Sequence, residues 1–352
     1  MPSPGFPGLV RARRYLAMLS VIDIHLWHWA AFTGFVLLAL AVDLGLFHRS
    51  GHEVRFREAL GWTAVWAACA FLFAFVVAPA TVSGWDRASA ATFATGYVVE
   101  LSLSMDNVFV MAVIFSYFGV PKAWQHRLLF WGILGALVMR GLMIWLGTEL
   151  IQRVHWMLYL FGAFLLLTGA KMLLSGGGDE APDLSRNPVV RLVRRFFPVS
   201  DSFDGENFTT VAAGRRVLTP LALVLVVVET TDVVFALDSI PAIFGITQEP
   251  FLVFTSNVFA ILGLRSLYFV LASAMGCFRY LKTGLALVLV FIGAKMILED
   301  PLKERFGDSL RNLSLGIVLG LILLSIAASV AASFLSGGTR DGGDGGKGTP
   351  EA

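Results

Sequence analysis

Six acidic side chains lie inside long apolar stretches of the sequence, where charged groups are rare. They are Asp43, Glu100, Asp106, Glu229, Asp232 and Asp238. A charge at the centre of a membrane helix costs about 2.5–3.5 kcal/mol on insertion scales, so these groups must face one another, buried cations or a water-filled cavity. Carboxylate and amide oxygens with hydroxyl neighbours suit hard divalent cations such as Mg²⁺, Ca²⁺ and Mn²⁺. The residue types therefore indicate a route or a site for such a cation.

Two basic side chains, Arg140 and Arg265, lie at a similar depth in apolar sequence and are the expected ion-pair partners of the acids. Six carboxylates and two guanidiniums leave an excess of negative charge, which protons or bound cations must compensate. In a second interpretation, the acids only pair with these arginines to fix helix packing. That interpretation accounts for about two of the six acids, because each arginine neutralises one charge.

The spacing of these residues predicts which of them share a helix face. Glu100, Ser104 and Asn107 follow the i, i+4, i+7 pattern of a single face, whereas Asp106 belongs to another. Pro241 lacks a backbone donor and clashes with the carbonyl four residues earlier. We therefore expect a helix break just after Asp238, which would free backbone carbonyls as further oxygen ligands.

The composition places this chain in the membrane. Of its 352 residues, 57% are hydrophobic and 15% charged, compared with about 45–50% and about 25% in a typical soluble domain. A net charge of +2 gives no basic face for nucleic acid, and two cysteines cannot form a disulfide scaffold. Since no nucleotide-binding loop or nucleophile–base pair is visible, we do not expect an enzyme. The sequence predicts an all-α membrane protein.

Nine apolar stretches are candidate transmembrane helices. They are Trp27–Phe47, Trp62–Ala80, Thr92–Phe118, Leu128–Leu146, Trp156–Leu174, Leu218–Ile246, Phe251–Ser273, Leu281–Leu298 and Leu313–Leu335. We divide the chain into an N-terminal extension (1–26), a transmembrane transporter domain (27–335) and a Gly-rich tail expected to be disordered (336–352). The longest polar insert, 175–216, separates the fifth and sixth stretches.

Lysines and arginines are unevenly shared between alternate loops, 15 on one side and 5 on the other. The positive-inside rule therefore predicts a cytoplasmic C-terminus and insert and an external N-terminus. Arg11, Arg13 and Arg14 contradict this orientation. We predict that translation starts at Met18, which would remove these three arginines. Recovery of residues before Met18 by N-terminal sequencing of the native protein would refute this prediction.

An internal repeat relates two thirds of the apolar stretches. Residues 106–109 match 232–235 at an offset of 126, residues 140–142 match 265–267 at 125, and residues 169–172 match 293–296 at 124. Each copy contains three helices, repeat one at 92–174 and repeat two at 218–298. Because three is odd, the second copy enters the membrane from the opposite side, as in many secondary transporters.

The acidic blocks 100–109 and 229–241, with 115–121, resemble the TerC family of bacterial integral membrane proteins, within the wider group of lysine-exporter-like transporters. The resemblance implies a protein of the bacterial inner membrane, linked to manganese efflux in some members and to tellurite resistance in others. Carried over by position, the metal-handling residues would be Glu100, Asp106, Asn107, Asp232 and Asp238, with Asp43 and Glu229 as additional candidates.

We therefore expect a secondary transporter that exports a divalent cation, Mn²⁺ first among the candidates, by proton antiport and with no permanently bound cofactor. Lipid and the cation are its expected partners. The alternative is a non-transporting membrane scaffold for tellurite or stress resistance or for membrane-protein biogenesis. In that case the carboxylate–arginine network is structural and the insert binds partners.

Overall fold

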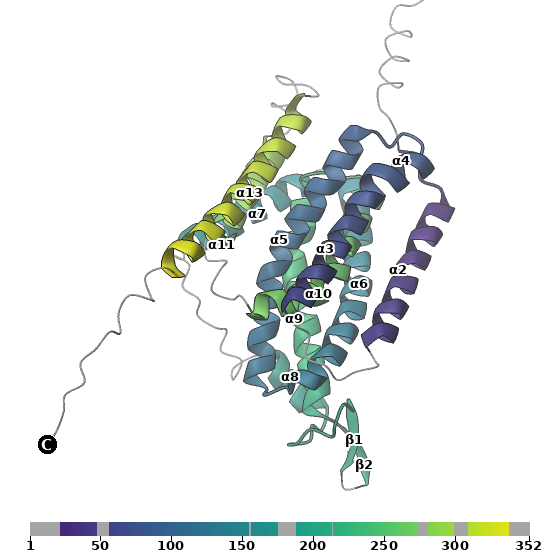
Figure 1. Cartoon of the computed structure of the whole chain (residues 1–352), viewed down its shortest axis with the longest axis vertical. Helices are drawn as coiled ribbons and strands as arrows, with labels where there is room; N and C mark the ends of the chain where they lie inside the picture. Colours follow the sequence, from purple (N-terminus) through teal and green to yellow (C-terminus); the bar gives the residue numbers. More distant parts are fainter. Residues whose placement is uncertain are drawn as a thin grey trace, which may run out of the picture.

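The computed structural model describes residues 22–47, 56–154, 156–174, 188–212, 214–273, 281–298 and 309–337, and this part of the chain is mostly helical (Figure 1). The elements are α2 (Leu26–Phe47), α3 (Phe56–Leu72), the π-helix η1 (Phe73–Val77), α4 (Ala78–Thr81), α5 (Arg87–Tyr117), α6 (Lys122–Arg153), α7 (Met157–Leu174), α8 (Pro188–Phe196), β1 (Thr209–Ala212), β2 (Arg215–Leu218), α9 (Pro220–Phe244), α10 (Pro250–Ser273), α11 (Leu281–Ile297) and α13 (Ser309–Gly337).

Six helical segments are long and apolar enough to cross a membrane. They are Phe56–Thr81, α5, α6, α7, α9 and residues Pro250–Leu271 of α10. Shorter apolar helices occur at Leu26–Val42, Thr283–Ile297 and Leu313–Ala328. The nine predicted stretches all fall on helices, but only six meet the length requirement within the described residues, so nine crossings remain a prediction. Large apolar side chains such as Val138 and Trp145 are exposed on α6, as expected of a surface that faces lipid.

Local sequence fixes where the central helices begin and end. Asp86 caps the N-terminus of α5, and its carboxylate accepts a hydrogen bond from the Ser89 amide at 2.7 Å. At the other end Gly119 adopts the left-handed conformation, with φ at 64°, and the Val120 amide donates to the Phe115 carbonyl. This C-terminal motif ends α5 and turns the chain directly into α6.

The predicted break in α9 is wrong. The helix runs without interruption from Pro220 to Phe244, with Pro241 inside its last turn. A proline removes only one helical hydrogen bond, and residues 239–244 around it are all buried. Packing on both sides of the proline thus keeps the backbone helical, so this part of α9 gives no evidence of freed carbonyl ligands.

The helices pack in pairs that join the first half of the chain to the second. α5 packs against α10, α6 against α9, and α7 against α11. In Figure 1, α7, α11 and α13 gather on one side of the bundle, and α2 lies at the opposite edge. The described apolar core forms two clusters, one mainly from α2, α3, α5, α6, α9 and α10 and the other centred on α7, α9 and α11.

Helices α7 and α11 touch through glycines. A Cβ on Gly162 would lie 2.9 Å from the Gly293 carbonyl oxygen, and one on Gly169 would lie 2.8 Å from the Ala286 carbonyl oxygen. The contacts run in opposite directions along the two helices, which are therefore antiparallel. Small residues allow this approach of two backbones, as in other membrane helix pairs.

We expect Gly293→Ala to destabilise the protein by about 1–3 kcal/mol, the usual effect of overpacking. The added Cβ would lie 2.6 Å from the Gly162 carbonyl oxygen and 2.8 Å from the Leu166 amide nitrogen, and neither backbone atom can move away alone. Thermal unfolding of the purified protein in detergent measures the effect. Gly316→Ala is the matched control because a Cβ there meets nothing within 4 Å in the described structure. Equal melting temperatures for the two variants would contradict this account.

The predicted polar insert contains regular structure. Its described part holds helix α8 and an antiparallel hairpin in which Thr209 pairs with Leu218 and Ala212 with Arg215. The hairpin therefore extends to Leu218, beyond the predicted boundary at 216, and α9 begins immediately after it. Helix α13 continues to Gly337, two residues into the segment predicted to be the tail. The proposed start at Met18 and most of both terminal segments lie outside the described residues.

Candidate functional site

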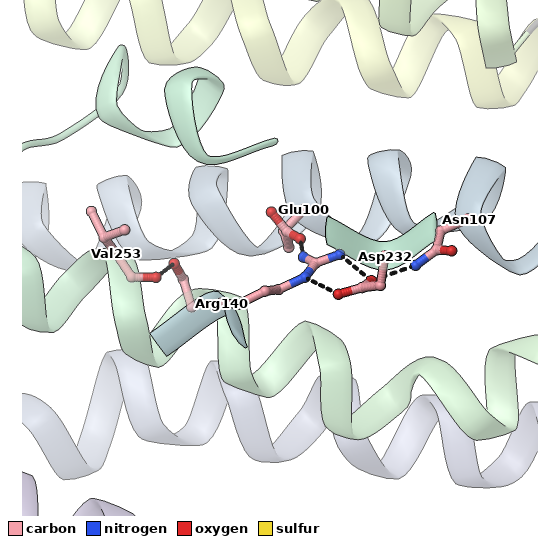
Figure 2. Close-up of polar contacts among 6 residues, drawn as sticks. Glu100, Asn107, Arg140, Asp232 and Val253 are labelled. Carbon is pink, nitrogen blue, oxygen red and sulfur yellow. Dashed lines mark hydrogen bonds and ion pairs between the residues drawn. The ribbon is translucent and has the colours of Figure 1, made fainter. Parts of the chain in front are cut away.

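A buried arginine joins two of the predicted acids between helices α5, α6 and α9 (Figure 2). Arg140 of α6 donates to Asp232 through Nε (3.2 Å to Oδ2) and Nη2 (3.0 Å to Oδ1), and its Nη1 pairs with Glu100 of α5. Asn107 of α5 donates to the same Asp232 carboxylate at 2.6 Å. We call these four residues the Arg140 cluster. None is more than 2% exposed, so the cluster is out of contact with solvent and lipid.

Helix geometry explains how the cluster forms. Glu100 and Asn107 are seven residues apart on α5, about two turns, and so lie on the same side of that helix. That side faces α9, which runs antiparallel to α5: a Cβ on Gly96 would lie 3.2 Å from Ile243, and Asn107 meets Asp232 at the other end. Arg140 reaches the crossing from α6, which packs on α9.

The cluster has an imbalance of charge and of hydrogen bonding. Two carboxylates face one guanidinium, which leaves one negative charge if all three groups are ionised. On the same face of α5, the buried Ser104 Oγ and Asn107 Oδ1 have no hydrogen-bond partner in the described structure. Buried oxygens without partners are costly. The arrangement therefore suits a proton or a cation, which would compensate the charge and bind these oxygens.

Three other predicted site residues lie on the same helices but outside the cluster. Asp106 is half-buried on α5, and because successive helical residues differ by about 100° it is directed away from Asn107. Glu229 lies one turn before Asp232, with its carboxylate against Gly135 of α6, where an added Cβ would overlap it. Asp238 shares a hydrogen bond with Thr168 of α7.

The remaining two predicted residues are Arg265 and Asp43, which lie on helices other than α5, α6 and α9. Arg265 is buried on α10, 5% exposed, and lies near enough to His126 of α6 to act on it electrostatically. Asp43 falls in α2, but its side chain lies outside the described set. The structure thus brings Glu100, Asn107, Arg140 and Asp232 together. Asp106, Glu229, Asp238 and Arg265 are not members of this cluster.

No group of three or more His, Cys, Asp or Glu side chains lies close enough to hold a metal ion, as far as the described residues show. Asn107 of the cluster and the neighbouring Ser104, which also offer oxygen atoms, are outside these residue types. The metal-handling set predicted from the sequence therefore remains a prediction.

The sequence reasoning missed two buried polar residues. Asn257 of α10 is 1% exposed, and neither atom of its amide has a hydrogen-bond partner in the described structure; the Ser239 hydroxyl of α9 is in the same condition. The signal was available, because Thr255-Ser256-Asn257 is a polar run inside an apolar helix. Figure 2 shows Val253, whose carbonyl accepts a hydrogen bond from Ser256 at 3.2 Å.

A polar pocket lies where α6 and α9 end, opposite the insert. Its lining comprises Thr148, Ile151, Gln152, Phe244, Gln248 and Glu249. Glu249 stands in the connection between α9 and α10, and desolvation of its carboxylate raises its pKa. A carboxylate of raised pKa exchanges protons closer to neutral pH than an ordinary glutamate does.

Comparison with known proteins identifies relatives over most of the chain. A protein of Myxococcus xanthus, described as an uncharacterized membrane protein, is 47% identical over 305 residues, 86% of this chain and 87% of its own length. The Alx protein of Escherichia coli K12, which is named as a candidate membrane-bound redox modulator, is 46% identical over 277 residues. The match covers 77% of this chain and 86% of the Alx protein. An uncharacterized membrane protein of Rickettsia bellii is 34% identical over 271 residues, 77% of this chain and 88% of its own.

No solved structure matches this chain significantly. The model of the integral membrane protein TerC family matches residues 85–335, which include every member of the Arg140 cluster. With multiple apolar helices and a family model over more than half of its length, this multi-pass membrane protein belongs to the TerC family.

Proposed function

We propose that this protein is a secondary transporter that exports a divalent cation, with Mn²⁺ as its cargo. The observation that carries the proposal is the Arg140 cluster, a buried pair of carboxylates with one guanidinium and unpartnered neighbouring oxygens at the crossing of α5 and α9. Ionisable groups inside a membrane bundle are a general mark of ion pathways. Oxygen ligands of this kind suit Mn²⁺ among the first-row metals.

We also propose that the two three-helix halves form an inverted repeat. A two-fold axis in the membrane plane makes equivalent helices antiparallel, which is the relation of α5 to α9 and of α7 to α11. The offset of 124 carries Gly162 onto Ala286 and Gly169 onto Gly293, so the two close contacts between α7 and α11 are equivalent to each other. The packing of α5 on α10 likewise has its counterpart in that of α6 on α9.

In this proposal Arg140 is a tethered substitute for the cargo. It holds Glu100 and Asp232 together when no cation is present, and a divalent cation that binds the acids displaces the guanidinium. Since one arginine cannot neutralise two carboxylates, the empty site takes up a proton and releases it when the cargo binds, which couples export to proton import. Glu249, with its raised pKa, lies at the end of α9 opposite the insert, where it would take up the incoming proton from the external side.

The test is Mn²⁺ flux into proteoliposomes that contain the purified protein, with and without an imposed pH gradient. We expect uptake of Mn²⁺ that accelerates when the gradient drives protons in the opposite direction. Empty liposomes and liposomes with Asp232→Asn protein are the controls. Flux no greater than that of empty liposomes, from protein that is folded and correctly inserted, would refute transport.

A non-transporting scaffold is the second candidate. Two observations favour it. The described residues contain no group of three acids, thiols or imidazoles that could hold a metal. The bidentate pairing of Arg140 with Asp232 is also what a purely structural network would contain. Deletion of residues 176–213 separates the two functions. A transporter should retain metal efflux without the insert, whereas a scaffold should lose its effect on stress resistance.

A further inference from the structure

We propose that helix α8 is an interfacial helix that binds the anionic phospholipid headgroups of the membrane in which the protein is inserted. The inference does not depend on the proposed transport function. It rests on the position of α8, on its exposed side chains and on its charge.

One face of α8 is already used in packing. Val193 is buried, Val189 and Val190 are partly buried against the first apolar cluster, and the helix contacts α9. These contacts hold α8 against the end of the bundle. Its orientation is therefore fixed, and the remaining faces are those available to other molecules.

Backbone hydrogen bonds place the end of α8 at the level where a membrane span begins. The Leu218 amide donates to the Pro198 carbonyl at 2.9 Å, and the Ser200 amide donates to the Leu218 carbonyl at 2.8 Å. Leu218 precedes by two residues the start of α9, which is long and apolar enough to cross the membrane. In Figure 1, α8 lies at the end of the bundle while the β1–β2 hairpin projects further away from it. The helix thus lies at the depth of the headgroups.

The exposed side chains of α8 and of the residue after it are apolar and basic. Leu192 is 56% exposed, Phe196 is 68% exposed, and Phe197 is 56% exposed. Leu192 and Phe196 are one turn apart and share a face. In water this apolar surface would be unfavourable, whereas at the membrane boundary it can enter the acyl region, as in other interfacial helices.

Three exposed arginines supply the charge complementarity. Arg191, Arg194 and Arg195 are interleaved with the apolar positions of the helix, and the segment Pro188–Phe196 contains no acidic residue. A guanidinium matches phosphate oxygens with paired hydrogen bonds. An anionic phospholipid satisfies both features of α8, because its phosphate meets the arginines while its acyl chains receive Leu192 and Phe196. An acidic soluble protein would match only the charge.

Spin labels test the depth of α8. In a cysteine-free background (Cys69→Ala, Cys277→Ala), labels are attached at Phe196→Cys and, as the matched control, at Val211→Cys, which is 69% exposed on the projecting hairpin. In nanodiscs with phosphatidylglycerol we expect the label at 196 to be more accessible to oxygen than to a water-soluble nickel chelate, and the label at 211 to show the reverse. Equal water access at both sites overturns the proposal. Shielding of residue 196 from both reagents also overturns it, because a protein partner or a second copy would then cover α8.

Lipid retention tests the charge without a label. Native mass spectrometry of the full chain should show that phosphatidylglycerol is retained in preference to phosphatidylcholine. The preference should fall at least tenfold when Arg191, Arg194 and Arg195 are all changed to Gln, since each basic residue near an anionic surface contributes several-fold to the affinity. Arg215→Gln with Arg216→Gln, both on β2, is the control and should leave the preference intact. Equal retention by the two variants, or no preference in the unaltered protein, refutes the proposal.

Discussion

Cells that depend on this protein for manganese export should accumulate manganese when Asp232 is replaced by Asn. The substitution keeps the shape of the side chain but removes the charge that binds Arg140 through two hydrogen bonds and accepts a third from Asn107. Loss of a charged ligand from a buried site costs at least about 1.4 kcal/mol, which corresponds to a tenfold loss of cation affinity. We therefore expect at least a tenfold lower efflux rate, measured from total cellular manganese in a strain that lacks other exporters.

The matched control is Asp201→Asn, because Asp201 is exposed in the insert, far along the chain from the cluster. It should leave manganese levels unchanged. Asp106→Asn, on the same helix as Glu100, should also raise cellular manganese if Asp106 belongs to the transport path. Normal manganese sensitivity in cells that express Asp232→Asn at the usual level in the membrane would count against the whole transport proposal.

The largest expected loss of stability follows from Arg140→Gln. Glu100 and Asp232 would then remain buried without their cation, and removal of one partner from a buried ion pair typically costs about 3–5 kcal/mol. We expect a strongly reduced melting temperature in detergent, or failure to accumulate in the membrane. The control is Arg153→Gln on the same helix, since Arg153 is exposed and pairs with Glu149 one turn away, an interaction worth about 0.3–0.5 kcal/mol.

A double variant separates charge from packing. Adding Glu100→Gln to Arg140→Gln restores the net charge of the cluster to that of the unaltered protein, so part of the lost stability should return. If the double variant is no more stable than Arg140→Gln alone, the lost stability arises from packing of the arginine side chain and not from unpaired acids. The role of Arg140 as a substitute for the cargo would then have no support.

The sequence predicted where the helices lie and which residues share a helix face, but it did not predict which side chains of different helices contact one another. Periodicity alone placed Glu100 and Asn107 on one face of α5, and apolar runs located the helices, because both depend on neighbours along the chain. That Arg140 would bind Asp232 and Glu100 together, while Arg265 lies near His126, depends on the way helices cross. Spacing within one helix does not contain that information.

At Pro241 a prediction from local sequence was wrong. The local rule that a proline disrupts a helix is sound, but the buried residues around it hold α9 continuous, so tertiary packing overrides local preference.

Asn257 was missed for a different reason. Asn257 carries no charge, but a buried amide with unpartnered atoms is as strong a departure from an apolar core as a buried charge.

The glycine contacts between α7 and α11 also determine how the distance between these helices is set. At each contact a glycine faces a main-chain carbonyl oxygen of the other helix, with side chains such as Val290 and Ile297 beside it, so the separation of the two axes depends on positions that carry no side chain. We expect this separation to stay constant when side chains around Asp232 exchange partners. The α7–α11 pair would then keep a fixed distance while helices elsewhere in the molecule move.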